Sequence, residues 1–214
     1  MPAEQALAAV LSDKSRFGQL LIQRTSAGGF VVCHRDDENA AGLKSLRRTE
    51  DAIEIVRYDQ AGKYRPLKTA PTLRRGWKLE VVDLGELRRA LDYFYPGRLA
   101  ILAAWTEEQL VVTPLRETLD RQSGMYRVAA NISDEQIDEV VASTCRSDGG
   151  CLRTILWKRD ARGAVTSTKL PPEKFDPAYD QSGRGENAIP LLCQEICSLL
   201  LNECRKAVKG EINE

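Results

Sequence analysis

The pattern of apolar and polar residues predicts a small mixed helix and hairpin domain in the first part of the chain. Apolar residues at helical spacing predict helices over residues 3–11, 49–58 and 84–94. Runs of β-branched and apolar residues predict strands over residues 19–25, 30–34 and 77–82. A Ser-Ala-Gly-Gly turn joins the first two strands as a hairpin. Thr49 is expected to cap the second helix, and residues 64–76, which contain two prolines, are expected to be irregular.

The second part of the chain is also predicted to contain short helices and hairpins. Hairpins are expected over residues 99–105 with 109–113 and over residues 151–158 with 165–169. Helices are expected over residues 133–144 and 189–209. Ser133 and Gln136 have the spacing of a capping box at the start of the first of these helices. Residues 170–187, rich in Pro, Gly, Asp and Ser, predict a long loop.

A Tyr-Pro-Gly break at residues 95–97 is the expected domain boundary. It divides the chain into an N-terminal domain, residues 1–95, and a C-terminal domain, residues 96–214. Helices mixed with hairpins in both parts predict an α+β fold. The final helix is expected to carry Cys193 and Cys197, which are candidate metal ligands.

Charge and hydropathy narrow the class of protein. The 31 Lys and Arg residues balance the 31 Asp and Glu residues, which argues against a protein that coats nucleic acid or an anionic membrane. No apolar stretch approaches the roughly 20 residues of a membrane helix, and residues 1–11 lack the basic region of a signal peptide. We therefore expect a cytoplasmic protein. Thiols stay reduced in that compartment, so clustered cysteines indicate metal binding or catalysis rather than disulfides.

Four cysteines form two pairs that are candidates for one metal centre. Cys145 and Cys151 flank a Gly-Gly turn, whose glycines let the backbone bend so that two thiolates face one point. Cys193 and Cys197 are four residues apart, and such residues share one face of a helix. Two thiolates from a loop and two from a helical turn could therefore converge.

The spacing favours an iron–sulfur cluster over zinc. Structural zinc sites use cysteine pairs separated by two to four residues, and the gap between Cys145 and Cys151 is wider. A four-iron cubane presents its irons farther apart than the bonds of one zinc ion, although the spacing is not that of a compact ferredoxin. The alternative is that the cysteines are small buried hydrophobic residues, which is the interpretation we give to Cys33 and favour for Cys204. Cys204, seven residues after Cys197, is also a candidate substitute ligand.

Other polar residues offer weaker candidates. His34 is the only histidine, which excludes histidine triads and two-histidine metal sites, and a structural or surface role is favoured for it. Arginine guanidinium groups bind carboxylates and stack on rings, so a pocket for a planar, multiply carboxylated ligand is one interpretation of a set of residues near the cysteines. That set is Arg116, Arg121, Tyr126, Arg127, Arg146 and Arg153. The alternative for each is a solvated surface side chain.

Three segments carry a resemblance to a known family. They are Cys-Arg-Ser-Asp-Gly-Gly-Cys-Leu-Arg-Thr-Ile-Leu-Trp, Leu-Pro-Pro-Glu-Lys-Phe-Asp-Pro and Ile-Pro-Leu-Leu-Cys-x-x-x-Cys. They resemble the C-terminal iron–sulfur region of a bacterial type II sirohydrochlorin chelatase-like protein, and Tyr-Arg-Pro-Leu-Lys-Thr-Ala-Pro at residues 64–71 resembles its stabilising domain. The resemblance implies a [4Fe-4S] cluster bound by Cys145, Cys151, Cys193 and Cys197.

The resemblance also limits the expected activity. Type II chelatase domains insert a metal into a tetrapyrrole with the help of histidines, and a single histidine does not supply that module. We therefore expect an accessory redox or regulatory protein that acts beside a chelatase, with an anionic tetrapyrrole as a candidate ligand. A structural zinc scaffold is the alternative from another class, and no catalytic constellation is apparent for an enzyme.

Overall fold

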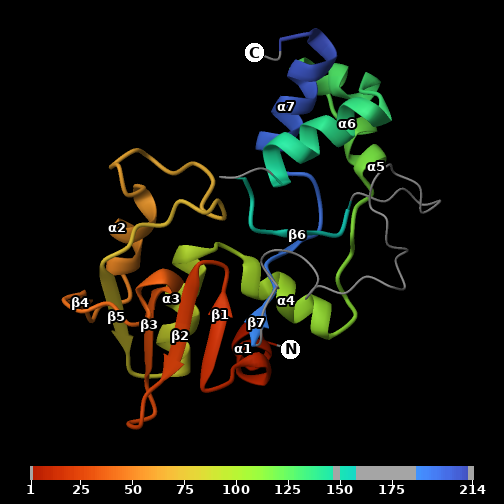
Figure 1. Cartoon of the computed structure of the whole chain (residues 1–214). Coiled ribbons are helices and arrows are strands. Elements are labelled where there is room, and N and C mark those ends of the chain that lie inside the picture. Colours follow the sequence, from red (N-terminus) through yellow and green to blue (C-terminus); the bar gives the residue numbers. More distant parts are fainter. Residues whose placement is uncertain (1, 147–149, 158–186, 212–214) are drawn as a thin grey trace.

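The computed structural model describes residues 2–146, 150–157 and 187–211, and it confirms the α+β class (Figure 1). A sheet with helices against it forms one part of the molecule, and a helical group stands above it in the figure. None of the helices in these ranges is long and apolar enough to cross a membrane. The expected strand over residues 165–169 and almost all of the expected loop over 170–187 lie outside the described residues.

A six-stranded sheet forms the base of the first part, in the order β4-β5-β3-β2-β1-β7. Its strands are β1 Lys14–Phe17, β2 Leu20–Arg24, β3 Phe30–His34, β4 Lys44–Leu46, β5 Trp77–Val81 and β7 Ala188–Ile189. The central strands pair antiparallel, which confirms the expected hairpin of β2 and β3. The edge strand β7 comes from late in the chain and pairs parallel with β1.

Among the described residues, four α-helices and one short 3-10 helix complete this part: α1 Ala3–Val10, η1 Arg35–Asp37, α2 Asp51–Arg57, α3 Leu84–Phe94 and α4 Arg98–Thr106. Alternate residues of the strands, such as Leu20, Ile22 and Val32, pack with α1, α3 and α4 in one hydrophobic core. Leu152 and Leu191, which come from the last third of the chain, enter the same core. The N-terminal core is therefore incomplete without the segments that carry the C-terminal cysteines.

The second part is mainly helical. It contains α5 Leu115–Asp120, η2 Gly124–Asn131, α6 Asp134–Val141, η3 Ala142–Arg146 and α7 Ser198–Lys209. The short strands β6 Thr154–Ile155 and β8 Leu192–Cys193 pair in parallel beside these helices. A second hydrophobic core joins α5, α6 and α7, and Trp157 is its largest buried side chain. The capping box of Ser133 and Gln136 is confirmed.

Residues 98–106 correct one sequence prediction. The expected hairpin of 99–105 with 109–113 is wrong, because the first segment is helix α4 and the second is not a strand. Leu99, Leu102 and Ala103 are its buried positions, which is the spacing of a helix. The run is also rich in Ala and Leu, which are strong helix formers, and Gly97 opens the helix in a left-handed conformation.

The C-terminal helix is also shorter than predicted. It begins at Ser198 rather than at residue 189, and the preceding residues form β7 and β8. Leu191, Leu192 and Cys193 are buried in succession, which a strand between two packed layers allows and a surface helix does not. Thr49 does not cap α2, whose N-cap residue is Glu50. The expected strand over 151–158 narrows to Thr154–Ile155.

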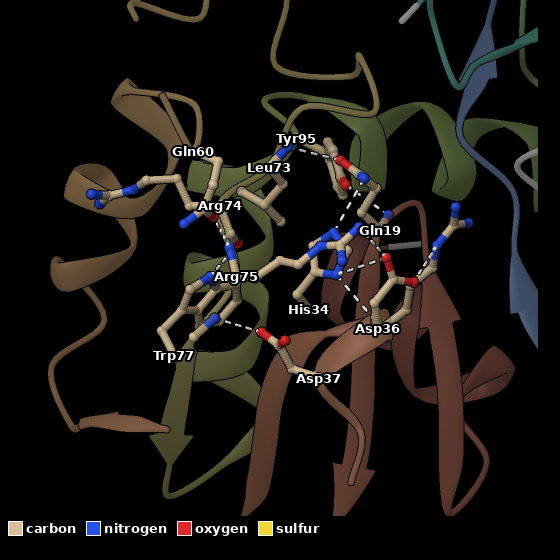
Figure 2. A network of polar contacts seen from close by, with 12 residues as sticks. Gln19, His34, Asp36, Asp37, Gln60, Leu73, Arg74, Arg75, Trp77 and Tyr95 are labelled. Carbon is tan, nitrogen blue, oxygen red and sulfur yellow. Dashed lines mark hydrogen bonds and ion pairs between the residues drawn. The ribbon is translucent and has the colours of Figure 1, made fainter. Parts of the chain in front are cut away.

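Gln19 is the centre of a buried polar network that ties an irregular loop to the sheet (Figure 2). Its backbone N–H donates to the Tyr95 hydroxyl at 2.8 Å, and its side-chain Oε1 accepts the Leu73 N–H at 3.0 Å. Its Nε2 lies 3.2 Å from Nε2 of His34. Because Leu73 belongs to the stretch 64–76, this network fixes the position of a loop that has no regular secondary structure.

His34 should titrate below its ordinary range. Burial lowers the pKa of this imidazole from 6.5, and its Nδ1 already accepts the Asp36 N–H. Below pH 6.5, His34 becomes protonated in the unfolded chain but stays neutral in the folded protein until the pH reaches its lower folded pKa. The free energy of unfolding should therefore fall as the pH falls from 6.5 towards that folded pKa. His34 is the only histidine, so its ring resonance in a proton NMR titration reports this pKa directly. The same titration in urea supplies the control, and equal pKa values in the two states would contradict the prediction.

Candidate metal centre

One pocket gathers the four cysteines of the two predicted pairs. Cys145, Cys151, Cys193 and Cys197 all line it. They come from three separate stretches of the chain, and hydrophobic side chains such as Leu67, Ile155 and Leu200 line the pocket beside them. The two pairs therefore face a common, mostly apolar space.

Short backbone elements position these thiols. Cys145 lies in the π-helical turn η3 that ends α6, and Cys151 lies three residues before β6. Cys193 is on β8, opposite Ile155 of β6, and Cys197 is the N-cap residue of α7. Cys193 and Cys197 therefore do not share a helix face as predicted. A strand and a helix N-terminus bring them to the pocket instead.

Four thiols are the possible metal-binding groups of this pocket. Among the described residues, no group of three or more His, Cys, Asp or Glu side chains could hold one metal ion. Four thiols around one pocket match the thiolate donor set of a four-iron cluster, whose irons are spread over a wider core. The residues present therefore fit a [4Fe-4S] cluster, and four thiolates are also the donor set of a Cys₄ zinc site.

Hydrogen-bond donors and positive charge surround the sulfur atoms. Trp157 donates its indole Nε1–H to Cys193 Sγ at 3.0 Å, and a guanidinium nitrogen of Arg153 lies 3.9 Å from the same sulfur. A second guanidinium, that of Arg98, donates to the backbone oxygen of Leu192 at 2.9 Å. Such groups stabilise the negative charge that thiolates bring into a buried site.

The pKa values of these groups reflect the same arrangement. Burial lowers the pKa of Arg153, but the thiolates of Cys151, Cys193 and Cys197 outweigh it and raise that pKa above its ordinary value. Burial raises the pKa of the Cys193 thiol, and Arg153 and the Trp157 N–H oppose this effect. The guanidinium and the sulfurs therefore stabilise each other's charged forms.

The N-terminal part also contributes to the pocket. Thr69 Oγ1 lies 3.2 Å from Cys151 Sγ, and Leu67 from the same loop lines the pocket. Sequence reasoning found Arg153 but missed Thr69, Trp157 and Arg98. Trp157 could have been considered from its place next to the cysteine segment. No pattern in the sequence connects Thr69 to a cysteine 82 positions later.

The other two cysteines do not line the pocket. Cys33 lies on β3 and Cys204 on α7, and both are buried, as expected for core residues. Burial raises the pKa of Cys33 to about 11, with Asp37 and Glu38 adding to the effect. Burial likewise raises the pKa of Cys204 to about 12. His34 is also a buried structural residue.

The predicted arginine set is dispersed. Arg116 donates to Asp134 at 2.5 Å and to the Ile132 carbonyl at 2.8 Å, while Arg121 is exposed and 3.7 Å from Glu117. Arg127 is exposed, and Tyr126 packs against the second core. The side chain of Arg146 is not among those that the structure describes. Of the set, Arg153 lines the cysteine pocket, and a ligand role for the others stays a prediction.

Two family models match consecutive parts of the chain. Residues 3–109 match the family model of the DR2241 stabilising domain, and residues 107–206 match that of a 4Fe-4S iron–sulfur cluster binding domain. The solved structure of DR2241 from Deinococcus radiodurans is similar, with a TM-score of 0.74 and 28% sequence identity. It is described as a multi-domain protein with structural similarity to chelatases and with two additional novel domains. No curated protein matches the chain.

The similarity covers 97% of this chain but 41% of that solved chain, so this chain spans less than half of its relative's length. The fold and the cysteine pocket define a [4Fe-4S] cluster-binding protein. The chain belongs to the DR2241 stabilising-domain family, which confirms the resemblance inferred from the sequence.

Alkylation should separate five of the six thiols into two groups. When iron is removed anaerobically with a chelator, the half-buried Cys145, Cys151 and Cys197 should be labelled by iodoacetamide. Cys33 and Cys204 should resist, because pKa values of about 11 and about 12, against an ordinary 9.0, reduce their thiolate fractions about 100-fold or more. Peptide mass spectrometry measures each site. Labelling in denaturant is the control, and rapid labelling of Cys33 or Cys204 in the folded protein would contradict the assignment.

Proposed function

We propose that Cys145, Cys151, Cys193 and Cys197 are the four ligands of the [4Fe-4S] cluster. The single observation that carries this assignment is their shared pocket, which neither Cys33 nor Cys204 lines. A cluster bound by four thiolates is an anion, and the guanidinium groups of Arg98 and Arg153 lie beside these thiols. The residues around the pocket therefore suit the charge as well as the donor chemistry of the group.

The cluster is proposed to serve redox or regulatory chemistry rather than catalysis. When bound, a [4Fe-4S] cluster can accept and release one electron. Four cysteine ligands leave no iron with an open position, which argues against its use as a Lewis acid. The apolar side chains around the sulfurs exclude water, and the N–H group of Trp157 stabilises negative charge on Cys193. Both properties influence the reduction potential of a cluster.

The proposed setting is tetrapyrrole metal chelation. Support comes from DR2241, which combines chelatase-like structure with two additional domains, while this chain aligns to 41% of it. These 214 residues include one histidine, so the metal-insertion step is assigned to a cytoplasmic chelatase unit other than the two domains described here. In this proposal the chain supplies electrons to, or reports redox state to, that chelatase.

Single Cys→Ser substitutions test the ligand assignment. Replacing Cys145, Cys151, Cys193 or Cys197 should abolish most of the cluster, because a serine oxygen is a poor ligand for iron in such clusters. Iron and acid-labile sulfide analysis of anaerobically purified protein measures the loss. Cys33→Ser and Cys204→Ser are matched controls and should retain both elements. Full cluster content in a Cys145→Ser protein, or colourless wild-type protein with stoichiometric zinc, would refute the assignment.

The redox role is tested separately. Dithionite should supply one electron per cluster, bleach the visible absorption and produce an electron paramagnetic resonance signal of a reduced cluster. A purified sirohydrochlorin-type chelatase should then bind the protein, and its metal-insertion rate should differ between the oxidised and reduced forms. The cluster-free Cys151→Ser protein is the control. Equal chelatase rates with both redox forms, together with no measurable binding, would contradict the proposed role.

A further inference from the structure

A loop of the N-terminal part reaches the cysteine pocket, where it lines the wall with Leu67 and brings one hydroxyl group, that of Thr69, to a cysteine sulfur. Thr69 is 4% exposed, and its Oγ1 lies 3.2 Å from Cys151 Sγ. The backbone of the same residue is also anchored, because the Leu152 N–H donates to the Thr69 carbonyl at 2.8 Å. Thr69 is therefore attached through its main chain and its side chain to the segment that carries Cys151.

The direction of the hydroxyl contact follows from its other partner. Arg153 donates its Nε–H to Thr69 Oγ1 at 3.2 Å, so one lone pair of that oxygen is already used. A thiolate bound to iron has no proton to donate. In the cluster-bound protein the Thr69 O–H must therefore be the donor and the Cys151 sulfur the acceptor. The neighbouring positive charge polarises the hydroxyl and strengthens this bond.

A buried arginine holds the loop that carries the hydroxyl. Arg65 is 3% exposed, and one of its terminal nitrogens donates to the carbonyls of Lys68 and Ala70 at 2.9 and 3.2 Å. These two residues flank Thr69. The Nε–H of Arg65 donates to Thr72 Oγ1 at 3.0 Å. The loop thus has little freedom to move the hydroxyl away from the sulfur.

We propose that Thr69 donates a hydrogen bond to the Cys151 sulfur and thereby raises the reduction potential of the cluster, so that the N-terminal domain tunes the redox properties of the C-terminal site. Reduction adds one negative charge to the cluster and its thiolates, and a hydrogen bond to sulfur stabilises that charge. Arg65 is a positioning residue that acts through Thr69. This inference rests on the proposed ligand assignment.

Measurement of the midpoint potential tests the inference. Thr69→Val replaces the hydroxyl by a methyl group of similar size, and it should shift the potential of the full-length, cluster-loaded protein to more negative values. Thr69→Ser keeps the hydroxyl and should stay close to the wild type. Thr49→Val changes a buried threonine of the N-terminal part that does not line the cysteine pocket, so it is the matched control and should keep the wild-type potential. Optical titration with dithionite, with iron and sulfide content measured in parallel, supplies the values.

The outcomes distinguish this inference from the ligand assignment. If the wild-type protein contains no cluster, the ligand assignment is wrong. If the Thr69→Val protein contains a full cluster and its reduction potential is unchanged, only the Thr69 inference is wrong. If Thr69→Val does not retain its cluster, Thr69→Ala, which removes the same hydroxyl without adding a methyl group beside Arg153, replaces it. Its midpoint potential should also be more negative than that of the wild type. A fully loaded Thr69→Ala protein with an unchanged potential would overturn the inference.

Discussion

The parallel pairing of β6 with β8 is the constraint on which the cysteine pocket depends. This short ladder places Thr154 opposite Leu192 and Ile155 opposite Cys193. It joins the segment after Cys151 to the segment that leads to Cys197 at the N-cap of α7. Each strand has two residues, so the ladder alone is weak. Its stability comes from the second hydrophobic core, which buries Ile155, Trp157 and Cys193 together.

A buried group of thiolates also requires compensating charge. Four negative sulfurs in an apolar pocket would repel one another and lose hydration, both of which are costly. Arg153 contacts Cys193 and Thr69, and Arg98 holds the backbone beside Cys193. The Trp157 N–H adds a neutral donor to the same sulfur. In the proposed cluster-bound protein, iron coordination and these partners together stabilise the deprotonated cysteines.

The two parts of the molecule depend on each other at this site. The C-terminal segments supply Leu152, Leu191 and strand β7 to the N-terminal core and sheet. In return, the loop around Thr69 packs onto the cysteine pocket and is held by Arg65 and by the Gln19 network. Stabilisation is therefore mutual, and the family description of the first part as a stabilising domain has a visible structural counterpart.

Local patterns in the sequence determined the elements whose residues interact with near neighbours: the β2–β3 hairpin, helix α3 and the capping box at Ser133. The spacing of the cysteines indicated the chemistry of the pocket, because thiolates and glycine turns are local features. Tertiary structure alone decided that residues 192–193 are a strand, and packing of Leu99, Leu102 and Ala103 selected the helix that the Ala- and Leu-rich run 98–106 also favours locally. Short apolar runs fit either conformation, and distant partners choose between them. The contact of Thr69 with Cys151 joins residues 82 positions apart, and only the folded chain brings them together.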